Sequence, residues 1–145
     1  MTTKPRTTLL TTTQLHYLDQ ACAVLTDAFG THPYLVGSAG ASDGDSYRDV
    51  DVRLMLGDAE FAAVCPTRER WELLCLAIGS YLRERSGLPV DFQIQRTREA
   101  NERFSGPRNP LGMDRFFAGG GDGTPDWATF DPAVRLDFLC RACWA

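Results

Sequence analysis

The feature that most constrains the fold of this chain is an alternating segment, residues 48–56. Every second position in it is apolar: Val50, Val52, Leu54 and Leu56. Successive side chains of a β-strand point to opposite faces of a sheet, so this pattern predicts a strand with one buried face. Asp49 and Asp51 are then expected to project together from the other face.

A second segment, residues 88–95, alternates in the same way. Its apolar side chains are expected to face the core, and Asp91, Gln93 and Gln95 to share the opposite face. A carboxylate on this second strand could then approach those on the first. Gln93 and Gln95 either line the same cleft or are simply polar side chains exposed to water.

A short apolar stretch, residues 34–36, leads into Gly37-Ser38, and ten residues separate Ser38 from Asp49. The stretch predicts a buried strand that ends in a glycine turn, where a backbone can approach a ligand closely. Residues 38–47 are rich in Gly, Ala, Ser and Asp and are expected to form a loop. Carboxylates beside such a turn suit divalent cations and a triphosphate, because Mg²⁺ prefers carboxylate and phosphate oxygens.

Helices are expected in five further segments: 13–29, 58–64, 67–85, 97–104 and 133–143. The first and third repeat apolar residues every three or four positions, as a helix with one buried face does. Thr12 or Thr13 is expected to cap the first helix, and Gly30 to end it. Residues 1–12 are expected to be a flexible tail and 13–145 a single domain with a Gly- and Pro-rich loop at 105–127.

Size and charge exclude several classes of protein. At 145 residues the chain can bury one real core. Its net charge of −4 argues against tight, nonspecific DNA binding, which needs many cationic contacts to phosphate. No apolar run approaches the roughly 20 residues that span a bilayer, and the first residues lack the apolar core of a secretory signal. We therefore expect a cytoplasmic protein that does not bind membranes.

Five cysteines are present, an odd number with irregular spacing, which argues against a disulfide framework. Cys140 and Cys143 form a lone CxxC pair. It either serves zinc or redox chemistry or consists of ordinary buried thiols. Phe116, Phe117 and Trp127 flank a glycine-rich loop, and they either stack on a base or acceptor or belong to the core.

The order of these elements and acids resembles the nucleotidyltransferase superfamily, whose best-known member is DNA polymerase beta. That family's signature is a strand ending in Gly-Ser, a short loop and an acid-apolar-acid-apolar strand. Here Leu35-Val36-Gly37-Ser38 and Asp49-Val50-Asp51-Val52 correspond to it, and Asp91 corresponds to a third acid on a later strand. The resemblance covers residues 34–95 and is greatest to small stand-alone phage or bacterial members.

The resemblance implies an α/β (α+β) fold, a minimal nucleotidyltransferase fold with a small mixed sheet packed by helices. It implies that Asp49 and Asp51 hold two Mg²⁺ or Mn²⁺ ions, while Asp91 holds the catalytic ion and helps take a proton. It also implies that Gly37 and Ser38 bind the phosphates of a nucleoside triphosphate. An acceptor hydroxyl would then receive a nucleoside monophosphate, and pyrophosphate would leave.

Two departures leave alternatives open. Arg48 stands where many relatives have serine, so it could contact phosphate or pair with Asp43 or Asp45. The large substrate domain of most relatives has no counterpart, so the acceptor could be a small molecule, RNA or a protein. The chain could instead be an inactive binding protein of the same fold, such as a phage factor that engages a host protein. A toxin-like enzyme acting on host transfer RNA or protein is the third possibility.

Overall fold

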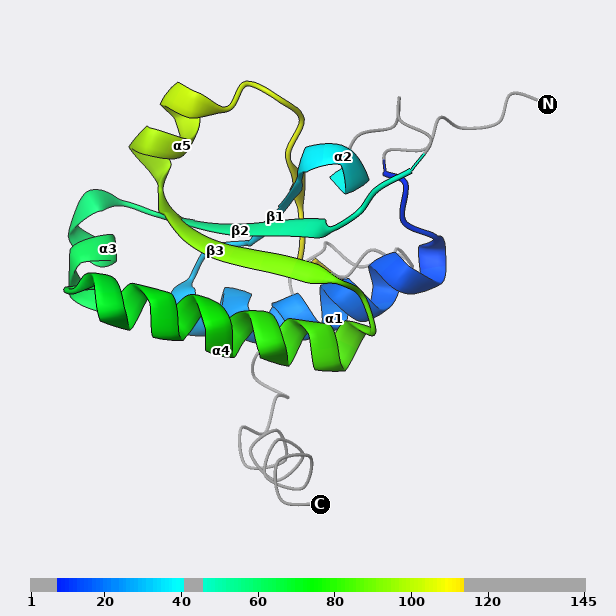
Figure 1. Ribbon diagram of the computed structural model, residues 1–145, viewed down its shortest axis with the longest axis horizontal. Helices are drawn as coiled ribbons and strands as arrows, with labels where there is room; N and C mark the ends of the chain where they lie inside the picture. Colours follow the sequence, from blue (N-terminus) through cyan, green and yellow to red (C-terminus); the bar gives the residue numbers. More distant parts are fainter. Residues whose placement is uncertain (1–7, 41–45, 114–145) are drawn as a thin grey trace, which may run out of the picture.

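The computed structural model describes residues 8–40 and 46–113, and in this part the chain forms a four-stranded mixed sheet packed against five helices (Figure 1). The elements are α1 (Thr12–Phe29), β1 (Tyr34–Val36), α2 (Gly37–Gly40), β2 (Val50–Leu56), α3 (Asp58–Val64), α4 (Arg68–Ser86), β3 (Val90–Arg96), α5 (Thr97–Arg103) and β4 (Asn109–Pro110). The expected mixed α/β class is confirmed. None of the helices in these residues is long and apolar enough to cross a membrane.

The strands lie in the order β3-β2-β1-β4. β1 runs antiparallel to both β2 and β4, whereas β2 and β3 are parallel and joined by α3 and α4. In the parallel pair Asp51 is the direct partner of Asp91. The register therefore places two of the three predicted site carboxylates next to each other.

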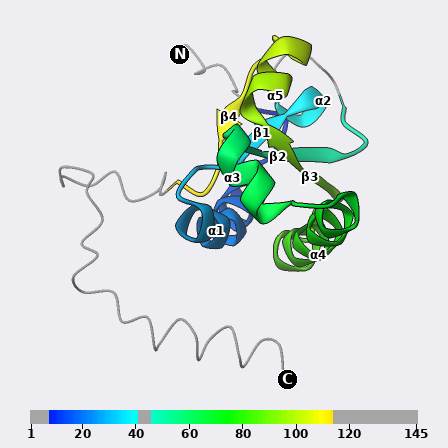
Figure 2. The same ribbon diagram turned by 90° about the vertical axis from the view of Figure 1, so that its left-hand side faces the viewer.

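The helices α1 and α4 cover one face of the sheet, as Figure 2 shows end-on. The alternation predicted for β2 is confirmed, because Val50, Val52 and Leu54 are fully buried against these helices. Leu18 of α1 and Leu82 of α4 are also fully buried in the same core. The opposite face, which carries Asp51 and Asp91, is covered less completely, by α2 and α5 (Figure 1).

One row of α4 residues, spaced four apart, follows the outer edge of β3: Trp71, Cys75, Gly79 and Arg83. The Trp71 indole N–H donates to the Ile94 carbonyl at 2.8 Å, and the Ile94 N–H donates to the Cys75 sulfur at 3.4 Å. Arg83 Nη1 donates to the Val90 carbonyl at 3.0 Å. These side chains occupy backbone groups that an exposed edge strand would otherwise offer to another chain.

The first helix begins one residue earlier than predicted. Thr11, rather than Thr12 or Thr13, is its cap: the Thr11 hydroxyl accepts from the Gln14 N–H at 3.1 Å. The Gln14 side chain accepts from the Thr11 N–H at 2.9 Å in return, which completes a capping box. Gly30 ends the helix as predicted, with a left-handed φ of 69°.

Residues 8–10, which we expected to belong to a flexible tail, are held against α2. The Thr8 hydroxyl and the Leu9 N–H both donate to the Ala39 carbonyl, at 2.7 Å and 3.0 Å. The Leu10 side chain is buried in the core. The prediction was wrong for these residues because a segment of three residues, Thr8 to Leu10, is too short to show a periodic pattern of packing.

Three further boundaries differ from the sequence prediction. The strand expected from Arg48 begins at Val50, so Asp49 precedes it. The segment after Gly37 forms the short helix α2 before any loop. Within the loop expected at 105–127, Asn109 and Pro110 pair with β1. The predictions for 114–145 (the last helix, the CxxC pair and the aromatic residues around the glycines) and for Asp43 and Asp45 fall outside the described residues.

Candidate functional site

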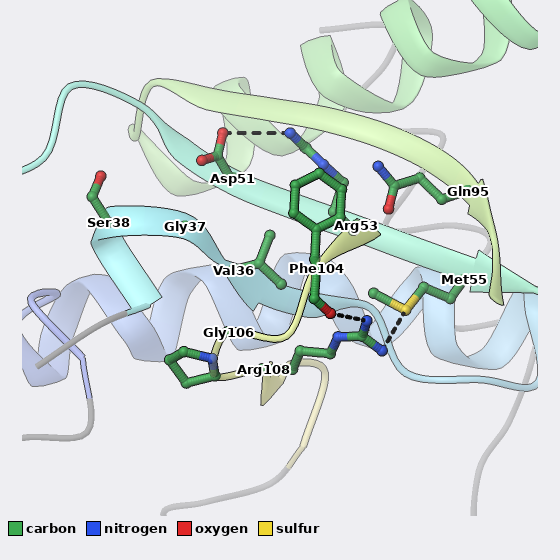
Figure 3. A pocket seen from close by; sticks show the side chains of 11 residues that line it. Val36, Gly37, Ser38, Asp51, Arg53, Met55, Gln95, Phe104, Gly106 and Arg108 are labelled. Atoms are coloured by element: carbon green, nitrogen blue, oxygen red, sulfur yellow. Dashed lines mark hydrogen bonds and ion pairs between the residues drawn. The ribbon is translucent and has the colours of Figure 1, made fainter. Parts of the chain in front are cut away.

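A cavity of about 400 Å³ opens on the polar face of the sheet, between α2 and the segment that follows α5 (Figure 3). We call it the carboxylate cavity. Its lining residues are Val36, Gly37, Ser38, Asp51, Arg53, Met55, Gln95, Phe104, Gly106, Pro107 and Arg108. Its volume is within the range of small-molecule sites, about 300–1,000 Å³.

The carboxylates of Asp51 and Asp91 are bridged by the guanidinium of Arg53. Arg53 Nη2 lies 3.5 Å from Asp51 Oδ1 and 3.1 Å from Asp91 Oδ2. Its other terminal nitrogen, Nη1, donates to the Asp91 carbonyl at 2.6 Å and to the Val52 carbonyl at 3.0 Å. The chain therefore places its own cation at the point where the two acids meet.

Burial raises the pKa of Asp51 above its ordinary value, and the positive charge of Arg53 only partly opposes this. The negative charges of Asp91 and Asp49 raise the pKa further, as does a hydrogen bond with the Asp91 carboxyl. Crowded carboxylates disfavour their own ionised forms, so the site gains from an additional proton or cation.

Gly37 brings the turn backbone directly against this pair. Its φ is +69°, a conformation that side chains with a Cβ rarely adopt. A Cβ placed on Gly37 would also collide with Asp51 Oδ2. Both facts require glycine here. The exposed Ser38 follows it, and Figure 3 shows Ser38 and Asp51 at the same end of the cavity.

Arg108 holds the opposite wall in place. Its Nη2 donates to the carbonyls of Ala100 and Phe104, at 3.1 Å and 3.3 Å, where α5 ends. Its Nη1 donates to Asn101 Oδ1 at 2.7 Å and lies 3.4 Å from Met55 Sδ. A cation that satisfies the last carbonyls of a helix stabilises that end, so Arg108 fixes the backbone from which Phe104 projects.

The other two predicted site residues are placed differently. Asp49 is exposed and precedes β2, although its charge still contributes to the raised pKa of Asp51. Arg48 is exposed too, and the lining of the carboxylate cavity does not include it among the described residues. Within residues 8–40 and 46–113, no three Asp, Glu, His or Cys side chains are arranged to hold one metal ion together.

The sequence analysis missed several lining residues. Arg53 and Met55 could have been found, because they continue the two-residue period of Asp51 along β2. Phe104 and Arg108 had no such signal, since their place depends on how the chain turns after α5. Gln95 lines the carboxylate cavity, so of the two alternatives, lining a cleft or being simply exposed to water, the first holds for this residue.

The cavity is thus lined by the Asp51 carboxylate, two arginine side chains, an exposed hydroxyl and an aromatic ring. Asp91 is not among the lining residues and reaches the site through its ion pair with Arg53. Carboxylates can bind a divalent cation or accept a proton, and a hydroxyl beside a glycine turn can bind phosphate oxygens.

Comparisons of this chain with protein-family models, with curated proteins and with solved structures gave no significant match.

Proposed function

We propose that the chain has a minimal nucleotidyltransferase fold and transfers a nucleoside monophosphate from a nucleoside triphosphate to an acceptor hydroxyl. The observation that carries this proposal is the pairing of Asp51 with Asp91 beside Gly37-Ser38. The resemblance stated above requires acids on two separate strands to meet next to that turn. In this chain β2 and β3 are adjacent parallel strands, and their register makes Asp51 and Asp91 direct partners.

The order of the elements also supports the proposal. A helix precedes β1, the glycine turn joins β1 to the antiparallel β2, and helices lead to the parallel β3. The same order underlies the resemblance to nucleotidyltransferases. Because a fold can host many functions, the activity has to be argued from the site itself.

The donor set fits a divalent cation held jointly by protein and substrate. Mg²⁺ is commonly bound by one or two carboxylates together with substrate phosphates and water. Asp51 and Asp91 would supply the carboxylates, and the burial and neighbouring negative charges that raise the pKa of Asp51 would also favour added positive charge there. A bound Mg²⁺ or Mn²⁺ would neutralise phosphate charge as the leaving group departs.

The residues of the chain would act on the substrate as follows. Ser38 and the backbone at Gly37 would hold the β- and γ-phosphates. The acceptor oxygen would form a bond to the α-phosphorus, the bond from that phosphorus to the bridging oxygen would break, and pyrophosphate would leave. Asp91, whose side chain is 50% exposed, would accept the proton of the acceptor hydroxyl.

Calorimetric titration with non-hydrolysable nucleoside triphosphates and Mg²⁺ tests the binding step. We expect the native protein to bind, and Asp51→Asn and Asp91→Asn each to weaken binding about tenfold or more, because each removes a charged partner. Glu72→Gln is the matched control, since Glu72 is an acid on the surface of α4 that pairs with Arg68. Equal affinity in native protein and both site variants would refute the proposal.

One observation favours a second candidate, an inactive binding protein that engages a protein partner. Arg53 already supplies a positive charge to the carboxylate pair, which lowers the need for a metal. Titration with Mn²⁺ separates the two candidates. A nucleotidyltransferase predicts tighter Mn²⁺ binding in Arg53→Gln than in native protein, whereas an inactive binding protein predicts no Mn²⁺ binding in either.

A further inference from the structure

A second cavity, of about 320 Å³, lies where β3 ends, among residues of α3, α4 and α5. We call it the aromatic cavity. The side chains that matter for its chemistry are Phe61, Trp71, Phe104, Arg96, Arg103 and Glu99. Figure 2 looks onto this end of the sheet and shows the three helices around β3.

The aromatic cavity has the composition of a site for a planar, anionic ligand. Three aromatic rings offer faces on which a ring can stack. The Arg96 guanidinium lies over one face of the Phe61 ring, 4.7 Å from its centroid, so the ring supports this cation while the N–H edge of the guanidinium can bind phosphate. Arg103 adds a second cation, and Glu99 can accept hydrogen bonds from the amino or hydroxyl groups of a nucleotide.

The two cavities adjoin each other. Gln95 and Phe104 line both of them. Phe104 is 59% exposed, although it is a large apolar side chain. A ligand that fills either cavity would cover part of this ring, and a ligand in the aromatic cavity would lie next to one in the carboxylate cavity.

We infer that the aromatic cavity binds a nucleotide, with its base among the aromatic rings and its phosphate at Arg96 and Arg103. The inference that a nucleotide binds here depends only on the residues that line the aromatic cavity. Its assignment as the acceptor site, from which a ribose hydroxyl reaches the carboxylate cavity, rests on the proposed function.

Calorimetric titration with the four common nucleoside monophosphates, without metal, tests the site. We expect at least one of them to bind, and the matching nucleoside and inorganic phosphate each to bind about tenfold more weakly. Phe61→Leu should weaken binding about fivefold by removing the ring that supports Arg96. Arg103→Gln should weaken it by a similar factor, and because Arg103 is exposed this substitution leaves the core intact.

Arg98→Gln is the matched control. Arg98 belongs to the same helix but points to Asp58, at 3.8 Å, and should not affect binding. The double variant Asp51→Asn/Asp91→Asn should also keep full affinity for the monophosphate. The inference is overturned if no monophosphate binds to the folded native protein, if Arg98→Gln weakens binding as much as Arg103→Gln, or if the double variant abolishes it.

These outcomes also separate this inference from the proposed function. Monophosphate binding that persists while triphosphate and metal binding fail would retain the nucleotide site and reject the transferase. If triphosphate and metal bind but no monophosphate does, the transferase is retained and its acceptor site must lie elsewhere. Transfer of a labelled nucleoside monophosphate onto the bound nucleotide, lost in Arg103→Gln and kept in Arg98→Gln, would establish the acceptor role.

Discussion

The two faces of the sheet carry opposite kinds of side chain on the same strands. On the face against α1 and α4, Val52 and Leu54 of β2 are fully buried among apolar neighbours. On the other face, Asp51 and Arg53 of the same strand are partly exposed and form ion pairs with each other. A single strand therefore supplies both the core and the candidate site.

The polar face is where this chain tolerates unfavourable electrostatics. Apolar burial against α1 and α4 stabilises the sheet, so the opposite face can hold acids whose negative charges help to raise the pKa of Asp51. Functional sites commonly place such groups where the surrounding fold is strong enough to keep them together. The comparison predicts that substitutions on the apolar face change stability most, and those on the polar face change ligand binding most.

The largest expected effect is on the apolar face. Leu54→Ala should lower the free energy of unfolding by about 3 kcal/mol, because it leaves a cavity in a fully buried position. Gln93→Ala, on the polar face of the neighbouring strand, should cost less than about 1 kcal/mol. Urea denaturation measures both, and similar losses in the two variants would contradict the contrast between the faces.

The next effect concerns the glycine turn on the polar face. Gly37→Ala should cost about 2 kcal/mol, from its positive φ and from the collision with the Asp51 carboxylate. Gly30→Ala is the matched control, because Gly30 has the same φ of +69° but nothing within 4 Å of an added Cβ.

The difference between these two variants isolates the contact with Asp51. In an Asp51→Ala background, Gly37→Ala should cost no more than Gly30→Ala, because the colliding carboxylate is gone. Thermal or urea unfolding of the four variants measures this. An unchanged cost in that background would mean that the backbone conformation alone requires glycine at position 37.

A smaller effect is expected from the pH dependence of stability. The folded state raises the pKa of Asp51, so it binds a proton more readily than the unfolded chain does. The contribution of Asp51 to stability therefore falls as pH rises from the ordinary pKa through the raised one. Asp51→Asn should remove this loss and increase the Tm at neutral pH.

Differential scanning calorimetry from acid to neutral pH measures this prediction. The difference in Tm between Asp51→Asn and native protein should grow with pH and then level off above the raised pKa. Glu69 is an exposed acid in the first turn of α4. For Glu69→Gln, the difference in Tm from native protein should not grow with pH. A Tm difference that is constant across the range would show that Asp51 titrates normally.

The smallest effect tests the protected edge of β3. Arg83→Met should cost about 0.5–1 kcal/mol, because it removes the hydrogen bond to the Val90 carbonyl. Arg70→Met on the exposed surface of α4 should change stability by less than that. Hydrogen exchange at β3 gives a second measurement, and we expect faster exchange in Arg83→Met than in Arg70→Met. Equal rates would refute the inference that Arg83 of α4 protects the edge of β3.

Much of the fold was predictable because it depends on local periodicity. The spacing of apolar residues predicted α1 and α4 to within a few residues, and alternation predicted β2 and β3. The short helices α3 and α5 were also expected at their observed places, without a periodic pattern to support them. The ends of elements were less predictable. Asp49 stayed outside β2 although the alternation extends to it, because a strand ends where its neighbour no longer provides hydrogen-bond partners.

Which side chains share a face of the sheet follows from the sequence alone, because side chains alternate along a strand with a period of two residues. It therefore predicted that Asp51 would lie opposite the buried valines and that Asp91 would lie opposite Phe92. Three features arise only when the chain folds: the register that pairs Asp51 with Asp91, the Arg53 bridge between them and the wall around Phe104. These depend on contacts between residues far apart in the chain, and packing of the whole core selects them over alternatives that satisfy the local pattern equally well.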